Sequence, residues 1–395
     1  MKLLVVSHKH CWPDANSPTG YATDGGFPFQ MRAISELFDT TTLLLPCLSS
    51  LPHQNGEPLI GHKLKVKPIT PLKGQDFTRK LYFPFWLLRN SFTILRAVIA
   101  ADAIHTPIPG DVGTIGMLLA FLLRKPLFVR HCGNWLRPVT TAEHFWKHSM
   151  IRWGGGRNFC LATGGSTEPP AAENPSIEWI FSTSLTQREL EQCRAQRSRE
   201  PQNTSRRGPR LVLAARQTVE KGTGVVIEAL PALLKDFPQI HFDVIGEGFD
   251  LAAFKQKAEQ LNVSQHVTFH GAVNHDRVIE LMQAADIFSF PTMASEGFPK
   301  VVLEALACGL PVITTHVSVL PTLIGEGGGL LLESATAPAL ADAVRRCLAD
   351  PERYRAMSQQ AVKTAQRFSL EVWRDTIGAH LTKAWGQSLR TLRKP

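Results

Sequence analysis

The chain has 395 residues, which corresponds to two or three domains. Hydrophobic residues make up 44% and charged residues 19%, a composition that excludes intrinsic disorder and allows a sizeable core. The formal net charge is +9, and residues 1–200 hold 22 Lys and Arg against 15 Asp and Glu. The basic excess therefore lies mainly in the first half and favours an anionic partner there.

The first half alternates between predicted strands and helices. The helix expected over 25–38 has apolar residues on one face, and the helix expected over 79–100 is amphipathic, with Pro84 as a candidate break or kink near its start. This alternation predicts βαβ units around a parallel sheet. The predicted strands span 2–7, 40–47, 64–69, 101–106, 126–130 and 158–164.

Residues 192–210 interrupt the alternation. They contain six Arg, one Glu and almost no large apolar side chain, so they read as an exposed linker. The second half then repeats the rhythm, with predicted strands at 211–215, 240–245, 267–270, 286–291, 311–315 and 329–332. The sequence therefore predicts an α/β protein of two doubly wound, Rossmann-like domains. The expected boundaries are 1–191 for the first domain, 192–209 for the linker, 210–375 for the second domain, and 376–395 for a C-terminal helix free to pack back on the first domain.

The cysteine pattern and the hydropathy pattern predict the cellular compartment of the protein. The seven cysteines include no CxxC pair, which argues against a disulfide framework or a zinc module and favours a reducing compartment. The apolar run at 3–6 is too short for a signal peptide, and the longest apolar stretch, 112–123, is too short to cross a bilayer. A cytoplasmic protein is expected, at most peripheral to the inner face of the membrane.

The most informative stretch follows a predicted strand that ends near residue 291. A loop with Glu296 and Gly297 leads to Pro299, expected at the first position of a helix over 300–307 that carries Glu304 one turn inside. A helix N-terminus after a parallel strand offers free N–H groups to a phosphate. The two carboxylates suit hydroxyl groups of a sugar and a ribose, although either Glu alone would more often be an ordinary surface residue.

Two cations follow the first strand of the second domain. Arg216 and Lys221 are five residues apart, and Gly222 comes next. Side chains that keep their charge suit a diphosphate, whereas the plainer alternative is a solvated loop.

The string EGFPKVVLEALACGLPVI, with seven residues between Glu296 and Glu304, resembles the signature of retaining, GT-B-fold glycosyltransferases of family 4. Arg216 and Lys221 match the family pattern G-R-x-x-x-x-K-G, except that Ala215 replaces the first Gly. The resemblance is clear from about 209 to 375 and weaker upstream. It implies a GT-B fold, with two Rossmann-like domains facing across a cleft, and a nucleotide diphosphate sugar as donor.

The resemblance also implies roles for other residues. His131 ends a strand in a stretch similar to the family's V-x-x-H-G/D element, although Cys132 interrupts the match, and it would contact the donor sugar. In isolation such a histidine is more often structural. Gly25 and Gly26 resemble a paired-Gly loop near the donor diphosphate, and a plain helix start is the alternative. The further positions implied for donor binding are Gly271, Val273, Gly297, Phe298, Lys300, Val301 and Glu304.

The resulting hypothesis is transfer of a hexose to a sugar or lipid-linked glycan acceptor with retention of configuration, in polysaccharide or glycolipid synthesis. Arg216, Lys221 and the helix amides would neutralise the leaving diphosphate, so no metal and no cofactor beyond the donor is expected. Glu304 would hold the ribose and Glu296 the sugar hydroxyls. The catalytic candidates are His131, Glu296, Arg216 and Lys221.

Three alternatives share parts of this pattern: a GT-B epimerase, a phosphorylase, and a non-catalytic protein that binds a sugar nucleotide or a lipid. The aromatic and basic run 79–96 also suggests contact with an anionic membrane, although a helix with its aromatic residues turned to the core is the simpler interpretation. No nucleic-acid-binding motif is present, so nucleic acid is not an expected partner.

Overall fold

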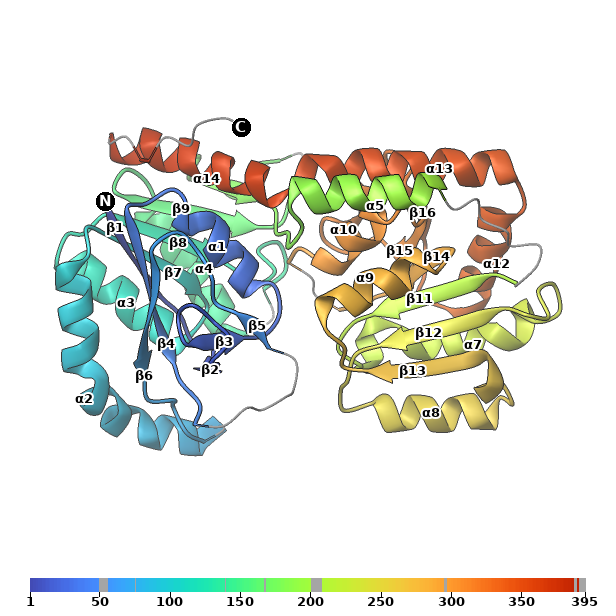
Figure 1. The fold of residues 1–395 in the computed structure, drawn as a ribbon, viewed down its shortest axis with the longest axis horizontal. Coiled ribbons are helices and arrows are strands. Elements are labelled where there is room, and N and C mark those ends of the chain that lie inside the picture. Colours follow the sequence, from blue (N-terminus) through green and yellow to red (C-terminus); the bar gives the residue numbers. More distant parts are fainter. Residues whose placement is uncertain are drawn as a thin grey trace. The chain divides into compact units, whose positions relative to one another are not determined.

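The computed structural model describes residues 1–49, 56–74, 76–138, 140–166, 168–199, 208–294, 297–386 and 389–390. The chain forms two compact units (Figure 1). Unit 1 comprises Met1–Ser184 and Leu370–Pro395, and unit 2 comprises Leu185–Ser369. Glu296 lies outside the described residues.

Unit 1 is built on a seven-stranded sheet in the order β10-β9-β8-β7-β1-β4-β6, with every neighbouring pair parallel. The strand order reverses between β1 and β7, which is the point where doubly wound sheets bind ligands. The segments that follow β1 and β4 in the chain form a small antiparallel sheet in the order β2-β3-β5. The strands are β1 Lys2–Val6, β2 Trp12–Pro13, β3 Tyr21–Thr23, β4 Thr40–Pro46, β5 Glu57–Pro58, β6 Leu64–Ile69, β7 Ala103–Ile108, β8 Leu127–His131, β9 Asn158–Thr163 and β10 Ile177–Ile180.

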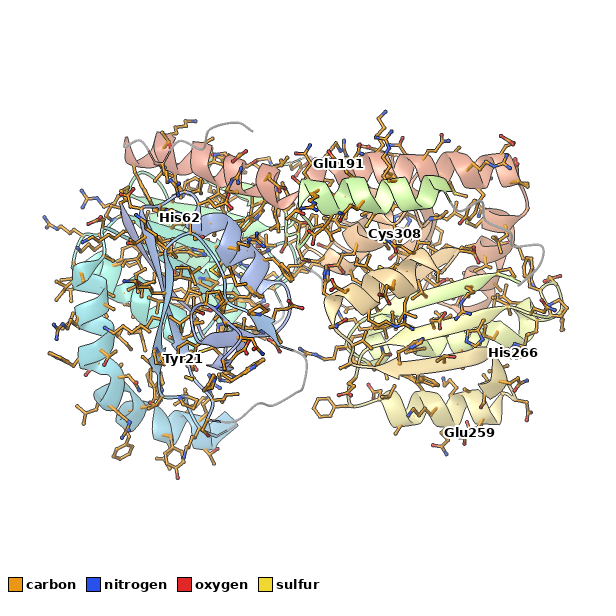
Figure 2. All side chains as sticks on the ribbon, in the orientation of Figure 1. Tyr21, His62, Glu191, Glu259, His266 and Cys308 are labelled. Carbon is orange, nitrogen blue, oxygen red and sulfur yellow. The ribbon has the colours of Figure 1, made fainter. Side chains whose placement is uncertain are left out.

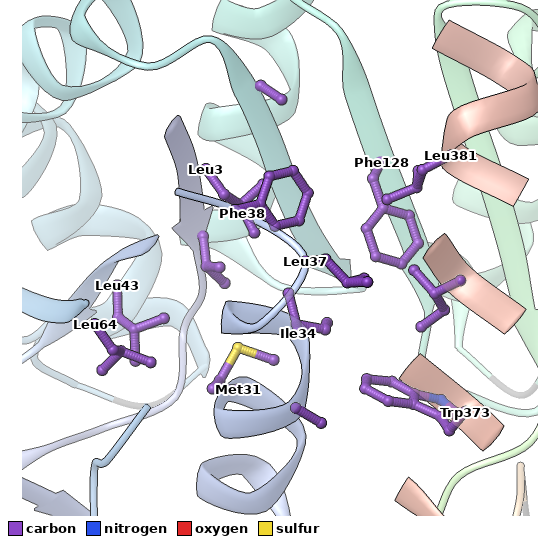
Figure 3. Packing of buried hydrophobic residues seen from close by; sticks show 14 of the residues in the cluster. Leu3, Met31, Ile34, Leu37, Phe38, Leu43, Leu64, Phe128, Trp373 and Leu381 are labelled. Carbon is purple, nitrogen blue, oxygen red and sulfur yellow. The ribbon is translucent and has the colours of Figure 1, made fainter. Parts of the chain in front are cut away.

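Successive side chains of each buried strand enter two different cores, because a strand alternates its faces. Leu3 and Phe128 pack with α1 and α14, and the packing of Trp373 and Leu381 from α14 into this cluster is visible in Figure 3. Their neighbours Leu4 and Val129 pack with α2, α3 and α4 on the other face. The helices of unit 1 are α1 Phe27–Ser35, α2 Asp76–Ala100, α3 Asp111–Leu122, α4 Thr141–Trp153 and α14 Leu370–Trp385.

Unit 2 has a six-stranded parallel sheet in the order β13-β12-β11-β14-β15-β16, which reverses between β11 and β14. Helix α7 contacts α8 and α12, and α10 contacts α5, α9 and α13. The elements are α5 Gln187–Arg199, β11 Arg210–Ala214, η1 Val219–Lys221, α7 Thr223–Leu233, β12 His241–Ile245, α8 Leu251–Gln260, η2 Ser264–His266, β13 Val267–Gly271, α9 His275–Gln283, β14 Ile287–Phe290, α10 Lys300–Ala307, β15 Val312–Thr315, α11 Leu320–Ile324, β16 Gly329–Leu332, α12 Ala337–Leu348, α13 Pro351–Ala365 and η3 Gln366–Phe368.

Two segments differ from the sequence expectation. Residues 192–199, expected in an exposed linker, belong to helix α5, whose Cys193 is buried. Figure 2 shows Cys308, at the end of α10, next to α5, and this contact gives the Arg-rich helix an apolar side to bury. The second difference is the point at which the chain returns from unit 2 to unit 1. It lies at Leu370, six residues before the start of the expected C-terminal helix at 376.

Pro84 lies inside α2, which is continuous from Asp76 to Ala100. The strand at the start of the chain, the helices between successive strands and the two parallel sheets agree with the alternation that the sequence predicts. Among the described residues, no helix combines the length and apolar character needed to span a bilayer.

Candidate functional site

The loops after β11 and β14 are joined at the reversal point of the unit 2 sheet. The carbonyl oxygen of Glu220 accepts hydrogen bonds from the backbone N–H of Met293, at 2.7 Å, and from the hydroxyl of Thr292, at 3.2 Å. Gly222 has φ +90°, and a Cβ there would lie 2.5 Å from the carbonyl oxygen of Pro291. Only glycine therefore combines this backbone conformation with this close approach.

The side chain of Gln217 holds the loop that follows β11. Its side chain is fully buried, and its amide nitrogen donates to the carbonyl oxygens of Ala215, at 2.9 Å, and Ile245, at 3.0 Å. Its amide oxygen accepts from the hydroxyl of Thr223 at 2.7 Å. A buried amide with three such bonds holds the backbone between Arg216 and Lys221 in one conformation.

The two predicted cations flank this fixed backbone. Arg216 is exposed and Lys221 is half-buried at the end of η1. The Asp250 carboxylate accepts a hydrogen bond from the backbone N–H of Val219 at 2.9 Å, which ties η1 to the start of α8. The structure thus presents Arg216 and Lys221 from one loop whose backbone is held by Gln217 and Asp250.

The β12 loop packs against the same turn. Gly246, at φ +113°, and Gly248 bring their backbone too close to the carbonyl oxygens of Ala215 and Gln217 for a side chain to fit. The backbone N–H of Gln217 donates to the carbonyl oxygen of Glu247 at 2.9 Å. These two glycines therefore serve close backbone packing.

Glu304 is buried, with 7% of its surface exposed, although it belongs to the helix that follows the β14 loop. Its Oε1 lies 3.2 Å from Nε2 of His275, the first residue of α9. Asn274 caps α9 through its side-chain oxygen, which accepts from the backbone N–H of Arg277 at 2.9 Å. Because the cap fixes the start of α9, His275 holds the Glu304 carboxylate in place.

The start of α10 differs in detail from the expectation. Pro299 occupies the cap position, not the first helical position, and Lys300 begins the helix. Phe298 is buried, with its ring centroid 6.0 Å from that of Phe368, so its side chain anchors the loop. The carbonyl oxygen of Gly297 accepts a hydrogen bond from the hydroxyl of Ser318 at 3.1 Å.

The remaining donor-binding candidates of unit 2 are near the same loops. Val301 is half-buried in the first turn of α10. Gly271 has φ +68°, and its carbonyl oxygen accepts from the N–H of Gly246 at 2.8 Å, which places the turn before Val273 beside the β12 loop. The structure therefore gathers the loops after β11, β12, β13 and β14 at one edge of the sheet. Glu296, the remaining catalytic candidate of this unit, falls outside the described residues.

His131 ends β8 in unit 1 and is completely buried. Its ring stands edge-on to Trp135, with centroids 5.2 Å apart, and neither ring nitrogen makes a hydrogen bond of normal geometry with a described residue. Burial lowers the pKa of His131 to about 4, although the Glu143 carboxylate and the Gly133 backbone oppose the shift. The imidazole is therefore neutral at pH 7.

Gly25 and Gly26 open α1, with Gly26 at the cap position and Gly25 at φ +66°. The neighbouring Asp24 forms an ion pair with Lys9, which follows β1. This pair fixes the start of α1 beside the carboxyl end of β1, at the reversal point of the unit 1 sheet.

Sequence reasoning missed His275 and Gln217. Each is a single polar residue whose role depends on which loops meet in three dimensions. A histidine at the first position of a helix after a strand-end glycine was the available signal for His275. Among the described residues, no three His, Cys, Asp or Glu side chains gather as metal ligands.

Two doubly wound parallel sheets, with loops clustered at the reversal point of each, define this chain as a protein of the GT-B fold. Residues 195–364 match the model of the glycosyl transferases group 1 family.

Curated relatives each match less than half of the chain. The D-inositol 3-phosphate glycosyltransferase of Corynebacterium urealyticum is 32% identical over 159 residues, 38% of this chain and 37% of that protein. The GDP-mannose-dependent alpha-(1-6)-phosphatidylinositol monomannoside mannosyltransferase of Mycolicibacterium smegmatis is 30% identical over 183 residues, 44% of this chain and 47% of that protein. The matched part spans less than half the length of these relatives.

Solved structures match nearly the whole chain at low identity. HepE of Anabaena, crystallised with UDP and glucose, has a TM-score of 0.71 at 18% identity and covers 97% of this chain and 100% of its own. WaaG, a glycosyltransferase involved in lipopolysaccharide biosynthesis, has a TM-score of 0.63 at 16% identity and covers 98% of this chain and 100% of its own. At this level of identity, the likeness establishes the fold of both units.

Proposed function

We propose that the protein is a retaining glycosyltransferase that moves a hexose from a nucleotide diphosphate sugar to a sugar or lipid-linked glycan acceptor, in polysaccharide or glycolipid synthesis. The observation that carries this proposal is the buried Glu304 carboxylate, held by His275 on the helix that follows the β14 loop. A carboxylate held in place by a histidine can accept charge-assisted hydrogen bonds from the hydroxyl groups of a ribose. The group 1 segment and the names of its relatives, which include nucleotide-sugar-dependent mannosyltransferases, support the same reaction.

The leaving diphosphate is assigned to the β11 loop and the start of α10. Arg216 and Lys221 supply two positive charges from a backbone that Gln217 holds rigid. The N-terminus of α10 adds the positive end of a helix dipole. Charges fixed before the reaction stabilise developing negative charge at little reorganisation cost, so catalysis is mainly electrostatic. In this proposal Glu304 binds the ribose and Glu296 the hydroxyls of the transferred sugar.

Unit 1 contributes His131 and the Gly25–Gly26 turn. A neutral, buried imidazole without a regular hydrogen-bond partner is suited to bind a sugar hydroxyl. The open backbone at the start of α1 is suited to a phosphate oxygen.

We place the acceptor reaction in the cytoplasm, at the inner face of a membrane when the acceptor is a lipid. The seven cysteines are all free thiols in the structure, which is compatible with a reducing compartment. The relatives from Mycolicibacterium and Corynebacterium are named for inositol-containing acceptors, which supports a glycolipid or polar sugar acceptor for this chain.

A nucleotide-sugar panel tests the proposal. Purified protein is mixed with UDP-, GDP- and ADP-hexoses, and the shift in thermal midpoint identifies the donor, since a ligand at about 100 times its Kd adds about 2.7 kcal/mol of stability. Release of the nucleoside diphosphate and the NMR coupling of the anomeric proton of the product then report transfer and retention. Conversion of the donor without an acceptor would instead identify an epimerase, and binding without turnover under every acceptor would leave a binding protein.

A further inference from the structure

Helix α2 exposes a continuous apolar stripe. Leu88, Phe85 and Phe92 are 79%, 72% and 71% exposed, respectively. The large apolar side chains exposed on α2 recur at intervals of four and three residues, which places them along one side of the helix. They are Leu81, Phe85, Leu88, Phe92, Leu95 and Ile99, with Tyr82 beside the first.

The orientation of α2 is fixed by its opposite side. Trp86 is buried and donates from Nε1 to the carbonyl oxygen of Thr70 at 2.6 Å. Asn90 is buried too, and its amide donates to the Thr70 hydroxyl at 2.7 Å. Ile94 and Val98 continue this side into the core against the sheet. The aromatic residues were expected mainly on the core side, but Phe85 and Phe92 lie on the outer side because Trp86 and Asn90 occupy the inner one.

A helix that is apolar on both sides is normally covered on both. The outer side of α2 faces away from the sheet of unit 1, and its side chains stand out from the unit in Figure 2. The neighbouring helix α3, which contacts α2, adds Leu118 and Leu122, which are also exposed. Apolar surface of this extent on a water-soluble unit marks an interaction site.

The charged residues beside the apolar stripe indicate what kind of partner covers it. Lys80, Arg89 and Arg96 are exposed on α2, and residues 77–100 contain no Asp or Glu. Arg124, just after α3, is exposed as well. Lys67 of β6 reaches the carbonyl oxygen of Thr93 at 3.4 Å, so a further cation lies along the helix.

A second copy of the chain is a poor match for this face. In a two-fold dimer the same patch meets itself, so the basic flanks would face one another with no carboxylate from residues 77–100 to pair with them. An anionic lipid surface supplies the missing negative charges and accepts the apolar side chains below its headgroups.

We propose that the outer face of α2 is a membrane-docking surface, which lays the helix in the plane of an anionic bilayer with Phe85, Leu88 and Phe92 inserted and Arg89 and Arg96 at the phosphate level. Binding is reversible, because one interfacial helix and a few basic residues give salt-sensitive attachment. The proposal stands apart from glycosyl transfer, since it concerns binding to vesicles in the absence of any donor.

The test is flotation of the full chain with phosphatidylcholine vesicles that contain or lack phosphatidylglycerol, at low and high salt. We expect binding only to the anionic vesicles at low salt. Phe85→Ser combined with Phe92→Ser, and separately Arg89→Glu combined with Arg96→Glu, should each weaken binding at least about tenfold. The side chains changed are exposed, so the variants should fold normally, which circular dichroism checks.

Matched controls come from unit 2. Phe249→Ser changes a phenylalanine that is even more exposed, at 96%, and Arg346→Glu with Arg355→Glu reverses two exposed helix charges. Both controls should bind vesicles as the wild type does. Donor binding measured without vesicles should be unchanged in the α2 variants, which separates a failure of docking from a failure of the proposed transferase activity.

Three results would overturn the proposal. One is no flotation of the wild type with anionic vesicles at low salt. Another is flotation that the α2 variants leave unchanged, since the contact would then lie elsewhere. The third is a dimer in sedimentation velocity without lipid that dissociates when Phe85 and Phe92 are replaced, which would make the face an interface between copies.

Discussion

The imidazole of His275 and the carboxylate of Glu304 lie 3.2 Å apart, and they join the first turn of α9 to the helix that follows the β14 loop. The two residues are 29 positions apart in the sequence. Their pairing positions the carboxylate assigned to the ribose before any donor arrives.

Replacing His275 by Ala should weaken donor binding by roughly threefold to tenfold, because Glu304 loses one hydrogen-bond partner and its position. Titration calorimetry with the donor found in the panel measures this change. His316→Ala removes a partly exposed histidine of the same unit and should leave donor affinity unchanged. Equal affinity in the wild type and the His275→Ala variant would show that the pair does not organise the site.

Glu304→Gln keeps the shape of the side chain and removes its charge. Donor affinity should fall, because charge-assisted hydrogen bonds to the ribose diol become neutral ones of about half the strength. A deoxyribose analogue of the donor should lose less affinity than the ribose donor when the same substitution is made. If both donors lose the same amount, the ribose role of Glu304 is wrong.

Lys221→Ala should lower kcat by roughly 30- to 1000-fold, which corresponds to about 2–4 kcal/mol of lost transition-state stabilisation. The fold should remain intact because Lys221 ends a short, partly exposed turn. Steady-state rates are compared with those of Lys235→Ala, an exposed lysine of the same unit. Near-normal turnover in Lys221→Ala would remove the phosphate role of this residue.

Gln217→Leu should destabilise unit 2 by about 1–3 kcal/mol, because the carbonyl oxygens of Ala215 and Ile245 lose a buried donor. Urea denaturation followed by circular dichroism measures the loss. Gln256→Leu, at an exposed position of α8, is the matched control and should change stability by less than about 0.5 kcal/mol. A loss equal to that of the control would mean that the loop does not depend on the buried amide.

His131 predicts a pH dependence of stability. Its pKa in the folded state is about 4, below the value of about 6.5 in the unfolded chain, so the unfolded state binds the extra proton first. The contribution is complete above pH 6.5 and is lost as the pH falls towards 4, by up to about 3 kcal/mol. His131→Asn should show a smaller fall between pH 7 and 4.5 in urea denaturation. Parallel curves for the two proteins would contradict the depressed pKa.

The sequence did not predict β10, the seventh strand of the unit 1 sheet, or the small antiparallel sheet β2-β3-β5. It did predict the two parallel sheets and the loops that carry the donor candidates. These features follow from local periodicity and from the rule that parallel strands end at one edge, so they do not require knowledge of distant contacts. The prediction that residues 192–199 are a linker was wrong, because these residues belong to α5. Their composition is Arg-rich, but one side of the helix carries Cys193, which is buried. This burial depends on contacts with α10 and α13, which are distant in the sequence.

The residues that support the site could not be predicted from the sequence for a related reason. Gln217 and His275 act through backbone groups and side chains of other loops, and a single sequence does not say which loops meet. The outer face of α2 shows the same limit, since the composition of 79–96 fits a helix turned either way, and the hydrogen bonds of Trp86 and Asn90 decide between the two.

Helix α14 has a consequence for the order in which the protein is made. Trp373, Ile377 and Leu381 complete the core that Leu3 and Met31 begin, so unit 1 is interrupted in the chain by the whole of unit 2. During synthesis from the N-terminus, the ribosome delivers every strand of unit 2 before α14 emerges. Unit 2 can therefore fold before unit 1 is complete, and the apolar surface of unit 1 that α14 covers stays exposed until that helix has been synthesised.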